Sequence, residues 1–563
     1  MISIMHLHLL SRRLGLALLS ALVACGLLAG AAVVRSAAPE QATGPAPARL
    51  TVAVDPALPE RVFNRLLSAL VYRVEEVGTA TGPKTVYLLD RPQLANALIT
   101  MAPLAEAGDG LLVQRFYAPV VPFATVTDEV AWAELAARWR GAGQGALLAP
   151  QEERFALAAL FGAPPADTVA FTRTAGLLPL LEADPNAVGL LPFHQLDPRF
   201  KVLAVDGVSV LDNHLDPAAY PLAAAVTVQG EEAAALAAAL APYLPETTNR
   251  DPARFTSLIM TGVTAMSRVT AAKMERNGYT YPALIISDTL RAADITHVSN
   301  EVPFLDDCVV NAAANNLVLC SHTNYWAALE ALGTDIVGLS GNHVNDFGRD
   351  GARRSIGWYR EQDIPIYGSG LNVEEACAPL LWEHNGNRFA FLAALAFEPS
   401  FAWATEDQPG ACYYYDNKER IFATIAELRP KVDIIAVELQ YLETYNPYPT
   451  AQQVKEFREL RDQGVDIVTG VQSHVPQAME PYGPEPGRKP GIIVYGLGNL
   501  FFDQMWSWQT RTELMARHAI YEGRLISTEI LTAVLEDWAQ PRWAAPEERA
   551  EILQRIFDAA PAR

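Results

Sequence analysis

The stretch Leu339-Ser-Gly-Asn-His-Val-Asn-Asp-Phe-Gly348 marks the end of an apolar run, residues 335–341, which is typical of a strand buried on both faces. Gly341 frees the backbone at the strand end, so Asn342 and His343 are presented at its tip. An Asn carbonyl oxygen suits a divalent metal, and a His suits a metal or a proton transfer. Taken alone, however, the stretch is better explained as a turn that caps the next helix.

Further apolar runs of strand length surround this stretch, and helix-length amphipathic stretches separate them. The alternation predicts a layered α/β sandwich over residues 249–540, with reactive loops beyond the strand ends. The other predicted strands are 257–263, 388–395, 433–439, 466–472 and 491–498, and the predicted helices are 325–332, 419–429 and 450–464.

The chain has 563 residues, which favours two folded domains because single cores stop growing at about 250 to 300 residues. Residues 49–248 alternate apolar and helical stretches and are predicted to form a first α/β domain. Residues 541–563 are predicted to form a C-terminal helix or tail. The net charge of −21 disfavours nucleic acid as a partner, since an acidic chain repels phosphate.

The N-terminus predicts export. Arg12 and Arg13 precede an uncharged apolar stretch, residues 14–34, which fits either a signal peptide or a membrane-spanning helix. Residues 22–25 resemble a lipoprotein cleavage box, but the sequence stays apolar afterwards, so we favour a chance Cys. With residues 1–48 as an export signal or membrane anchor plus linker, we expect the rest of the chain outside the cytoplasm, in the cell envelope, either membrane-anchored or secreted.

Four of the five cysteines, Cys308, Cys320, Cys377 and Cys412, lie in the predicted second domain. In an oxidising compartment they can pair in three ways, and the sequence alone cannot choose. We favour Cys308 with Cys320. The spacing is not that of a thiolate zinc site.

Four motifs in order carry a resemblance to a known family: 293–301 (ADITHVSNE), 341–348 (GNHVNDFG), 464–480 (GVDIVTGVQSHVPQAME) and 495–503 (YGLGNLFFD). They resemble the motifs of the CapA family, part of the calcineurin-like metallophosphatase superfamily and linked to capsule and poly-γ-glutamate assembly. The resemblance implies a metallophosphatase-type sandwich in the second domain.

The resemblance also implies roles for single residues. Asn342 and His474 would hold a metal, and Glu301 would bind the metal or act as a base. His343 would protonate a leaving oxygen as the catalytic acid or stabilise negative charge that develops on it. Asp346 would orient His343, although capping the following helix is an equal alternative. The implied cofactor is one divalent ion (manganese, iron or zinc) or none. The expected pocket-lining residues are Asn300, Gln440, Glu443, Gln472, Asn499 and Asp503, and for Asn499 and Asp503 a turn-stabilising role is an equal alternative.

This sequence departs from the family pattern where the family holds two metals. Val263 stands where the first strand normally ends in an Asp. Gln440 replaces a His, with Glu443 standing for the family's Glu, and Val471 and Gln472 replace two more His. Losing an Asp removes a ligand and a charge, and Gln is a weak ligand for transition metals. We therefore expect a site for one cation rather than an efficient two-metal phosphoesterase.

Residues 49–248 show a more diffuse resemblance, to the type II periplasmic solute-binding fold. It is carried by residues 123–141, 187–210 and 220–222. The alternative is an α/β domain that only spaces the second domain from the membrane.

Three functions follow. The first is a cell-envelope protein of capsule or poly-γ-glutamate-type polymer assembly with a divergent metallophosphatase-like site. The second is a metal-dependent phosphoesterase or hydrolase with an exported substrate. The third is a non-catalytic protein that binds a solute or polymer. The expected partners are an anionic or carbohydrate polymer or a small solute, and the membrane through the N-terminal segment.

Overall fold

The computed structural model describes residues 48–313, 315–483 and 489–562. The predicted export segment therefore lies outside the described residues, apart from its last residue. Within the described ranges, no helix is both long enough and apolar enough to cross a membrane.

The C-terminal part is built on two sheets. The first sheet has seven strands in the order β18-β17-β14-β13-β27-β28-β29. Strands β13, β14, β17 and β18 run parallel, whereas β27 to β29 add an antiparallel meander. The strand bounds are β13 (Phe255–Thr264), β14 (Ile295–Asn300), β17 (Ile336–Gly338), β18 (Ile366–Tyr367), β27 (Thr512–Tyr521), β28 (Arg524–Glu536) and β29 (Gln540–Trp543).

The second sheet has six strands in the order β20-β21-β23-β24-β26-β25. Its central strands β21, β23, β24 and β26 are parallel, and each edge strand is antiparallel to its neighbour. The strand bounds are β20 (Leu380–His384), β21 (Asn387–Leu395), β23 (Ile434–Gln440), β24 (Ile467–Val471), β25 (Met479–Tyr482) and β26 (Gly491–Val494).

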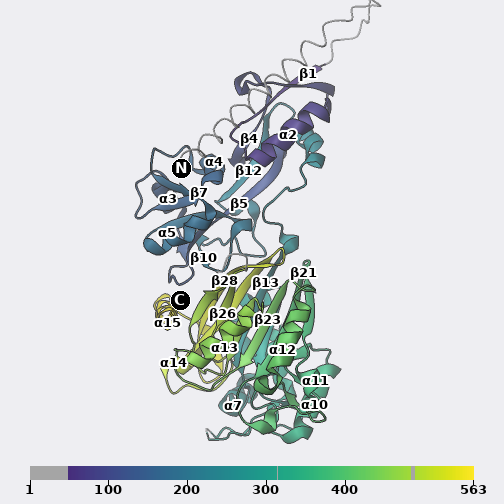
Figure 1. Cartoon of the computed structure of the whole chain (residues 1–563), viewed down its shortest axis with the longest axis vertical. Helices are drawn as coiled ribbons and strands as arrows, with labels where there is room; N and C mark the ends of the chain where they lie inside the picture. Colours follow the sequence, from purple (N-terminus) through teal and green to yellow (C-terminus); the bar gives the residue numbers. More distant parts are fainter. Residues whose placement is uncertain (1–47, 314, 484–488, 563) are drawn as a thin grey trace, which may run out of the picture. The chain divides into compact units, whose positions relative to one another are not determined.

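The two sheets pack face to face through an apolar core that includes Leu258, Phe391 and Leu514. Helices cover both outer faces. Figure 1 shows α12 (Tyr414–Leu428) and α13 (Ala451–Asp462) over the sheet that contains β23. The other outer face is covered by α7 (Arg268–Asn277), α8 (Ser287–Arg291), α9 (Trp326–Ala331) and α10 (Gly348–Glu361). The layered α/β sandwich predicted from the sequence is confirmed, with four layers.

Each predicted strand of this part lies within two residues of an observed one, except that β17 and β26 end earlier than their apolar runs. The long antiparallel strands β27 and β28 were not predicted. Both mix apolar residues with Arg, Glu and Thr, and β27 also contains His518; this mixture hid strands whose polar side chains are largely buried. The predicted C-terminal helix is α15 (Pro546–Asp558).

The N-terminal part is also α/β, as predicted. Its sheet has the order β2-β3-β1-β4-β12-β5-β9-β7-β8, with β10 beside β5. The strands are β1 (Ala48–Val54), β2 (Glu76–Thr79), β3 (Gly82–Leu88), β4 (Ala97–Pro103), β5 (Leu111–Pro122), β7 (Leu147–Pro150), β8 (Val169–Thr172), β9 (Val188–Pro192), β10 (Phe200–Val202) and β12 (Ala223–Gly230). The helices are α2 (Glu60–Tyr72), α3 (Trp132–Trp139), α4 (Arg154–Phe161), α5 (Leu177–Ala183) and α6 (Ala233–Leu240).

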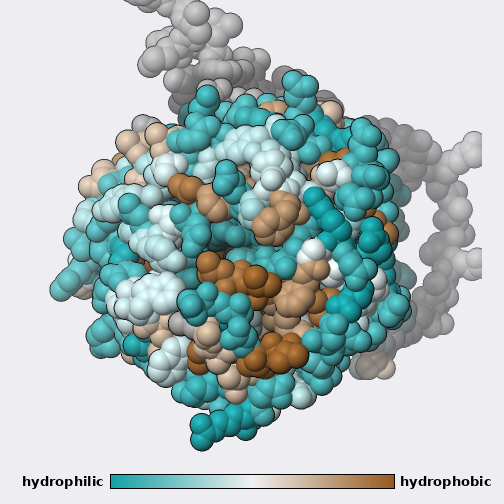
Figure 2. All heavy atoms as spheres, turned by 90° about the horizontal axis from the view of Figure 1, so that it is seen from below, coloured by the Kyte–Doolittle hydropathy of each residue, from teal (hydrophilic) through white to brown (hydrophobic). Residues whose placement is uncertain are grey.

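Two disulfides form, Cys308–Cys320 and Cys377–Cys412. The favoured pairing is thus the one observed. Cys308–Cys320 ties together the segment between the short strands β15 (Phe304–Leu305) and β16 (Ser321–His322). Figure 2 shows a few apolar residues gathered on the lower face of the molecule within a hydrophilic surface.

Candidate functional site

The candidate site lies where four parallel strands from both sheets end. Glu301 follows β14, Asn342 and His343 follow β17, Gln440 ends β23, and His474 follows β24. Reactive loops of α/β sheets gather beyond the carboxyl ends of parallel strands, and this sandwich brings two such edges together. Sequence motifs as far apart as Glu301 and His474 thus reach one place.

Gln440 is at the centre of this site. Its Nε2 donates to Glu301 Oε2 at 3.0 Å and to Asn342 Oδ1 at 3.1 Å, and all three side chains are buried. Burial raises the pKa of Glu301, while positive charge on His343 or His474 and the bond from Gln440 oppose that rise. The amide therefore sits between two residues that the sequence predicted as metal ligands.

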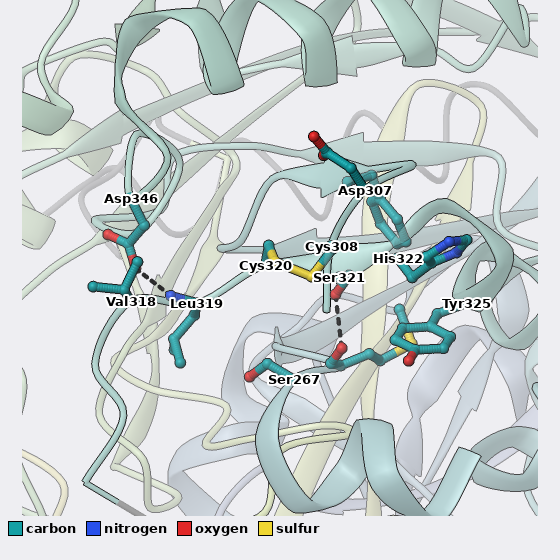
Figure 3. Close-up of a disulfide and its surroundings, with 12 residues drawn as sticks. Ser267, Asp307, Cys308, Val318, Leu319, Cys320, Ser321, His322, Tyr325 and Asp346 are labelled. Atoms are coloured by element: carbon teal, nitrogen blue, oxygen red, sulfur yellow. Dashed lines mark hydrogen bonds between the residues drawn. A yellow bond between two sulfur atoms is a disulfide. The ribbon is translucent and has the colours of Figure 1, made fainter. Parts of the chain in front are cut away.

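His343 and Asp346 form a hydrogen-bonded pair. His343 Nδ1 lies 2.7 Å from Asp346 Oδ2, which also accepts the backbone N–H of Leu319 at 2.7 Å (Figure 3). Burial lowers the pKa of His343, but the bond to Asp346 and the charges of Glu301, Asp346 and Glu443 outweigh it and raise the pKa. Asp346 therefore orients His343, and no side chain caps α10.

The segment that supplies Leu319 is held by the Cys308–Cys320 disulfide, which lies close to Asp346 in the fold (Figure 3). Ser321, directly after the disulfide, donates from its hydroxyl to the carbonyl of Met266 at 3.0 Å. The covalent link and this hydrogen bond together fix the amide that orients Asp346.

His474 is held from one side by Asn499. His474 Nδ1 lies 2.9 Å from Asn499 Oδ1, so the ring donates its proton there and leaves Nε2 bare in the neutral form. Nε2 lies 3.5 Å from Glu443 Oε1. An imidazole oriented through its second nitrogen is the usual arrangement of a metal-binding or acid–base His.

Asn300 and Asp503, predicted to line the pocket, make structural contacts. Asn300 bonds the Val302 carbonyl at 2.7 Å and the hydroxyl of Tyr359 at 3.1 Å. Asp503 accepts the backbone N–H of Val269 and forms a buried ion pair with Arg268, both inside the first turn of α7. Gln472 is buried next to the site at a backbone φ of 79°.

The departures from the family pattern lie at the site. Val263 is fully buried and its backbone pairs with Asn499 and Leu500, so an apolar side chain stands where the family has a carboxylate. Val471 is paired with Gln440 across β23 and β24.

A second buried polar cluster lies between the two sheets. Glu438, two residues before Gln440, accepts from the hydroxyls of Ser299 at 3.1 Å and Ser340 at 3.0 Å. His297 lies 3.7 Å from Glu438 and is hydrogen-bonded to Tyr367 at 2.8 Å. Burial raises the pKa of Glu438 to about 7 and lowers the pKa of His297 to about 3.

The residues present fit one cation better than two. Among the described residues, no three His, Cys, Asp or Glu side chains gather closely enough to hold a metal ion. Three buried oxygen atoms, Glu301 Oε1, Gln440 Oε1 and Gln472 Oε1, have no hydrogen-bond partner there. Such oxygens suit a single hard cation, whereas a dinuclear centre needs anionic or imidazole ligands around both ions.

Several residues around the site escaped the sequence analysis. Arg268 carries no motif and becomes visible only through its pairing with Asp503. Tyr445 stacks on the His474 ring at 5.5 Å and meets Trp506 at 5.9 Å. Neither ring belongs to a strand, and only their exposure in the fold separates them from core aromatics.

Comparison with known proteins bears on this geometry. Residues 257–504 match the family described as bacterial capsule synthesis protein PGA_cap. The match covers somewhat less than half of the chain. The family is part of the metallophosphatase-like superfamily, and the match spans the strand ends that form the candidate site.

Two relatives of this chain carry related names. The capsule biosynthesis protein CapA of Bacillus anthracis is 27% identical over 311 residues, covering 54% of this chain and 73% of the relative. The PGA biosynthesis protein CapA of Bacillus subtilis (strain 168) is 24% identical over 259 residues, covering 46% of this chain and 66% of the relative. The chain thus spans about two thirds to three quarters of the length of these two proteins.

A solved structure is similar to a smaller share of the chain. The ABC-type phosphate transport receptor from Vibrio cholerae covers 33% of this chain and 87% of its own length, at 13% identity and a TM-score of 0.25. A TM-score of this size does not establish a shared ligand or activity.

Asp346→Asn should lower the pKa of His343, because it removes the carboxylate that stabilises the imidazolium. The pKa is measured by NMR titration of the ring, with assignment from a His343→Gln sample. Asp350→Asn, an exposed position in the same segment, serves as the control and should leave the value unchanged. An unchanged pKa in Asp346→Asn would show that the pair does not orient or charge His343.

Glu438→Gln should stabilise the C-terminal α/β sandwich above neutral pH. The folded-state pKa of about 7 exceeds the ordinary 4.5, so the folded state holds its proton more tightly and stability falls as pH rises from about 4.5 to 7. Gln does not titrate, so the variant does not lose this stability as pH rises. At pH 8 its free energy of unfolding should exceed that of the wild type by up to about 3 kcal/mol, whereas at pH 4 the two free energies should be similar. Denaturant unfolding at both pH values measures this, and a variant less stable at pH 8 would contradict it.

Proposed function

We propose that this protein takes part, outside the cytoplasm, in the assembly of a capsule-type or poly-γ-glutamate-type polymer, and that its candidate site binds the growing or exported chain. The PGA_cap match and the names of the two Bacillus relatives support this polymer class. Two disulfides in the described residues support an oxidising compartment. The N-terminal segment would provide the link to the membrane.

The observation that carries the proposal is the position of Gln440. Its amide holds Glu301 and Asn342 together where a two-metal enzyme would place cations. A site organised by hydrogen bonds can keep a defined shape and bind a ligand without the electrophilic centres that phosphoester cleavage requires. The retained constellation of Glu301, Asn342, His343 and His474 supports binding at the same place.

If the site takes up one cation, Glu301, Asn342 and His474 would hold it, and the ion would neutralise part of the local negative charge. Gln440 would then release one or both of its partners. His474 is already oriented to bind a cation through Nε2, because Asn499 holds the ring at Nδ1.

A metal-dependent hydrolase is the second candidate, and the His343–Asp346 pair favours it. The raised pKa of His343 favours its protonated form, and since Nδ1 is bonded to Asp346, the proton on Nε2 is the one that could be delivered to a leaving oxygen. Asp346→Asn and His343→Gln would abolish such an activity, whereas polymer binding would persist.

Deletion of the gene in its native host should reduce cell-surface polymer by at least about tenfold, measured as released hexose, hexosamine and glutamate after acid hydrolysis. The wild-type gene should restore the polymer, and an Asn342→Ala/His474→Ala double variant should fail to do so at equal protein level. Tyr72→Ala, an exposed residue of α2 distant in sequence from the site, is the matched control and should restore it. Unchanged surface polymer after deletion would overturn the proposal.

A further inference from the structure

Two large aromatic rings stand exposed beside the candidate site. Trp506 is 63% exposed and Tyr445 is 49% exposed, although most aromatic residues of this part are buried. We call these two rings the aromatic ledge. Tyr445 lies in the loop after β23, five residues beyond Gln440, and Trp506 lies three residues beyond Asp503. Two loops from distant parts of the chain thus expose indole and phenol at one place.

The aromatic ledge is rigidly supported from beneath. The Tyr445 ring stacks on His474 with centroids 5.5 Å apart and an interplanar angle of 24°, and it meets Trp506 edge-on at 5.9 Å. His474 rests in turn on Phe502 at 5.6 Å, and the Arg268 guanidinium lies 4.8 Å from the Phe502 centroid. A ring held in this way exposes its face at little cost in conformational entropy, which is the property of an aromatic binding anchor.

A carboxylate borders the ledge. Glu443 Oε1 accepts the Tyr445 hydroxyl at 3.3 Å, lies 3.5 Å from His474 Nε2, and its side chain is 43% exposed. Exposed aromatic faces stack on the C–H faces of pyranose rings, and a neighbouring carboxylate accepts hydrogen bonds from two adjacent sugar hydroxyls. The ledge with Glu443 therefore combines the two groups that recognise a carbohydrate.

The local charge disfavours a polyanion at the ledge. Glu443, Glu301 and Asp346 lie around His343 and His474. Arg268, which interacts electrostatically with Tyr445, is paired with Asp503. Poly-γ-glutamate carries a carboxylate on every residue and no ring to stack, so it would meet repulsion and gain no aromatic contact. A neutral or N-acetylated sugar chain meets neither difficulty.

We infer that the aromatic ledge is a sugar-binding subsite, and that the polymer handled at this site is a carbohydrate chain whose pyranose rings stack on Trp506 and Tyr445. This inference rests on the proposed role in polymer assembly and narrows the polymer to one chemical class. The stacked ring would place the adjoining part of the chain over His474 and Glu443.

Binding of the purified full-length protein to an array of bacterial glycans, with poly-γ-glutamate spotted beside them, tests the inference. The wild type should bind at least one neutral or N-acetylated glycan and should not bind poly-γ-glutamate. Trp506→Ala should bind that glycan at least about tenfold more weakly, because it removes an aromatic anchor. Tyr445→Phe keeps the ring and should retain most of the binding, whereas Tyr445→Ala should lose it.

Tyr72→Ala, which removes an exposed ring from α2, is the matched control and should bind like the wild type. Melting temperatures show whether each variant is folded, and Trp506 is exposed enough for its removal to be tolerated. Absence of binding to any glycan, equal binding by Trp506→Ala, or ledge-dependent binding of poly-γ-glutamate would each overturn the inference. The loss of polymer on gene deletion is measured separately. If the aromatic ledge does not bind sugar, the proposed function is still decided by the deletion experiment alone.

Discussion

Two hydrogen bonds from the side-chain amide of Gln440 join the two sheets of the C-terminal sandwich at their carboxyl edge. Gln440 belongs to β23 in the second sheet, whereas Glu301 and Asn342 follow β14 and β17 in the first. Glu301 Oε1 is buried and has no hydrogen-bond partner. Without the Gln440 amide, Oε2 would also be buried without a partner, and leaving both carboxylate oxygens unpaired would destabilise the fold. The geometry of the site thus depends on Gln440, where the family resemblance implied a His.

The remaining features of the site are consistent with that constraint. His343 and His474 are each oriented through Nδ1 by a side chain outside the strands, so both keep a bare Nε2 near Glu301 and Glu443. Burial raises the pKa of Glu301 and raises the pKa of Glu438 to about 7, so the buried interior disfavours further negative charge. Sugar hydroxyls are better ligands for such a surface than the carboxylates of a polyanion.

The sequence predicted the parts of the fold whose pattern is local. The apolar runs that became β13, β21, β23 and β24 are buried on both faces, so continuous hydrophobicity marks them. The strands β27 and β28 carry Glu513, His518 and Thr528 inside the fold, and this burial of polar groups cannot be inferred from the pattern of one strand. The polar residues of β27 and β28 are the reason that neither strand was predicted.

The sequence predicted which residues lie at the site but not the contacts between them. The motifs placed Glu301, Asn342, His343 and His474 at strand ends, and the fold brings those ends together. The sequence could not show the hydrogen bond from Gln440 to Glu301 or the bond from Leu319 to Asp346, because each joins residues of different elements. The exposure of Trp506 beside Tyr445 also becomes visible only in the folded structure. Asp503 was predicted to line the pocket, and its pairing with Arg268 could be found only in three dimensions.

The central claim is that hydrogen bonds from Gln440, and not a pair of metal ions, organise the site. The most direct measurement is the metal content of the protein purified without chelator or affinity nickel, by mass spectrometry for manganese, iron and zinc, beside an Asn342→Ala/His474→Ala double variant. The account predicts no more than one equivalent per chain in the wild type. Two equivalents that survive gel filtration and disappear in the double variant would contradict it.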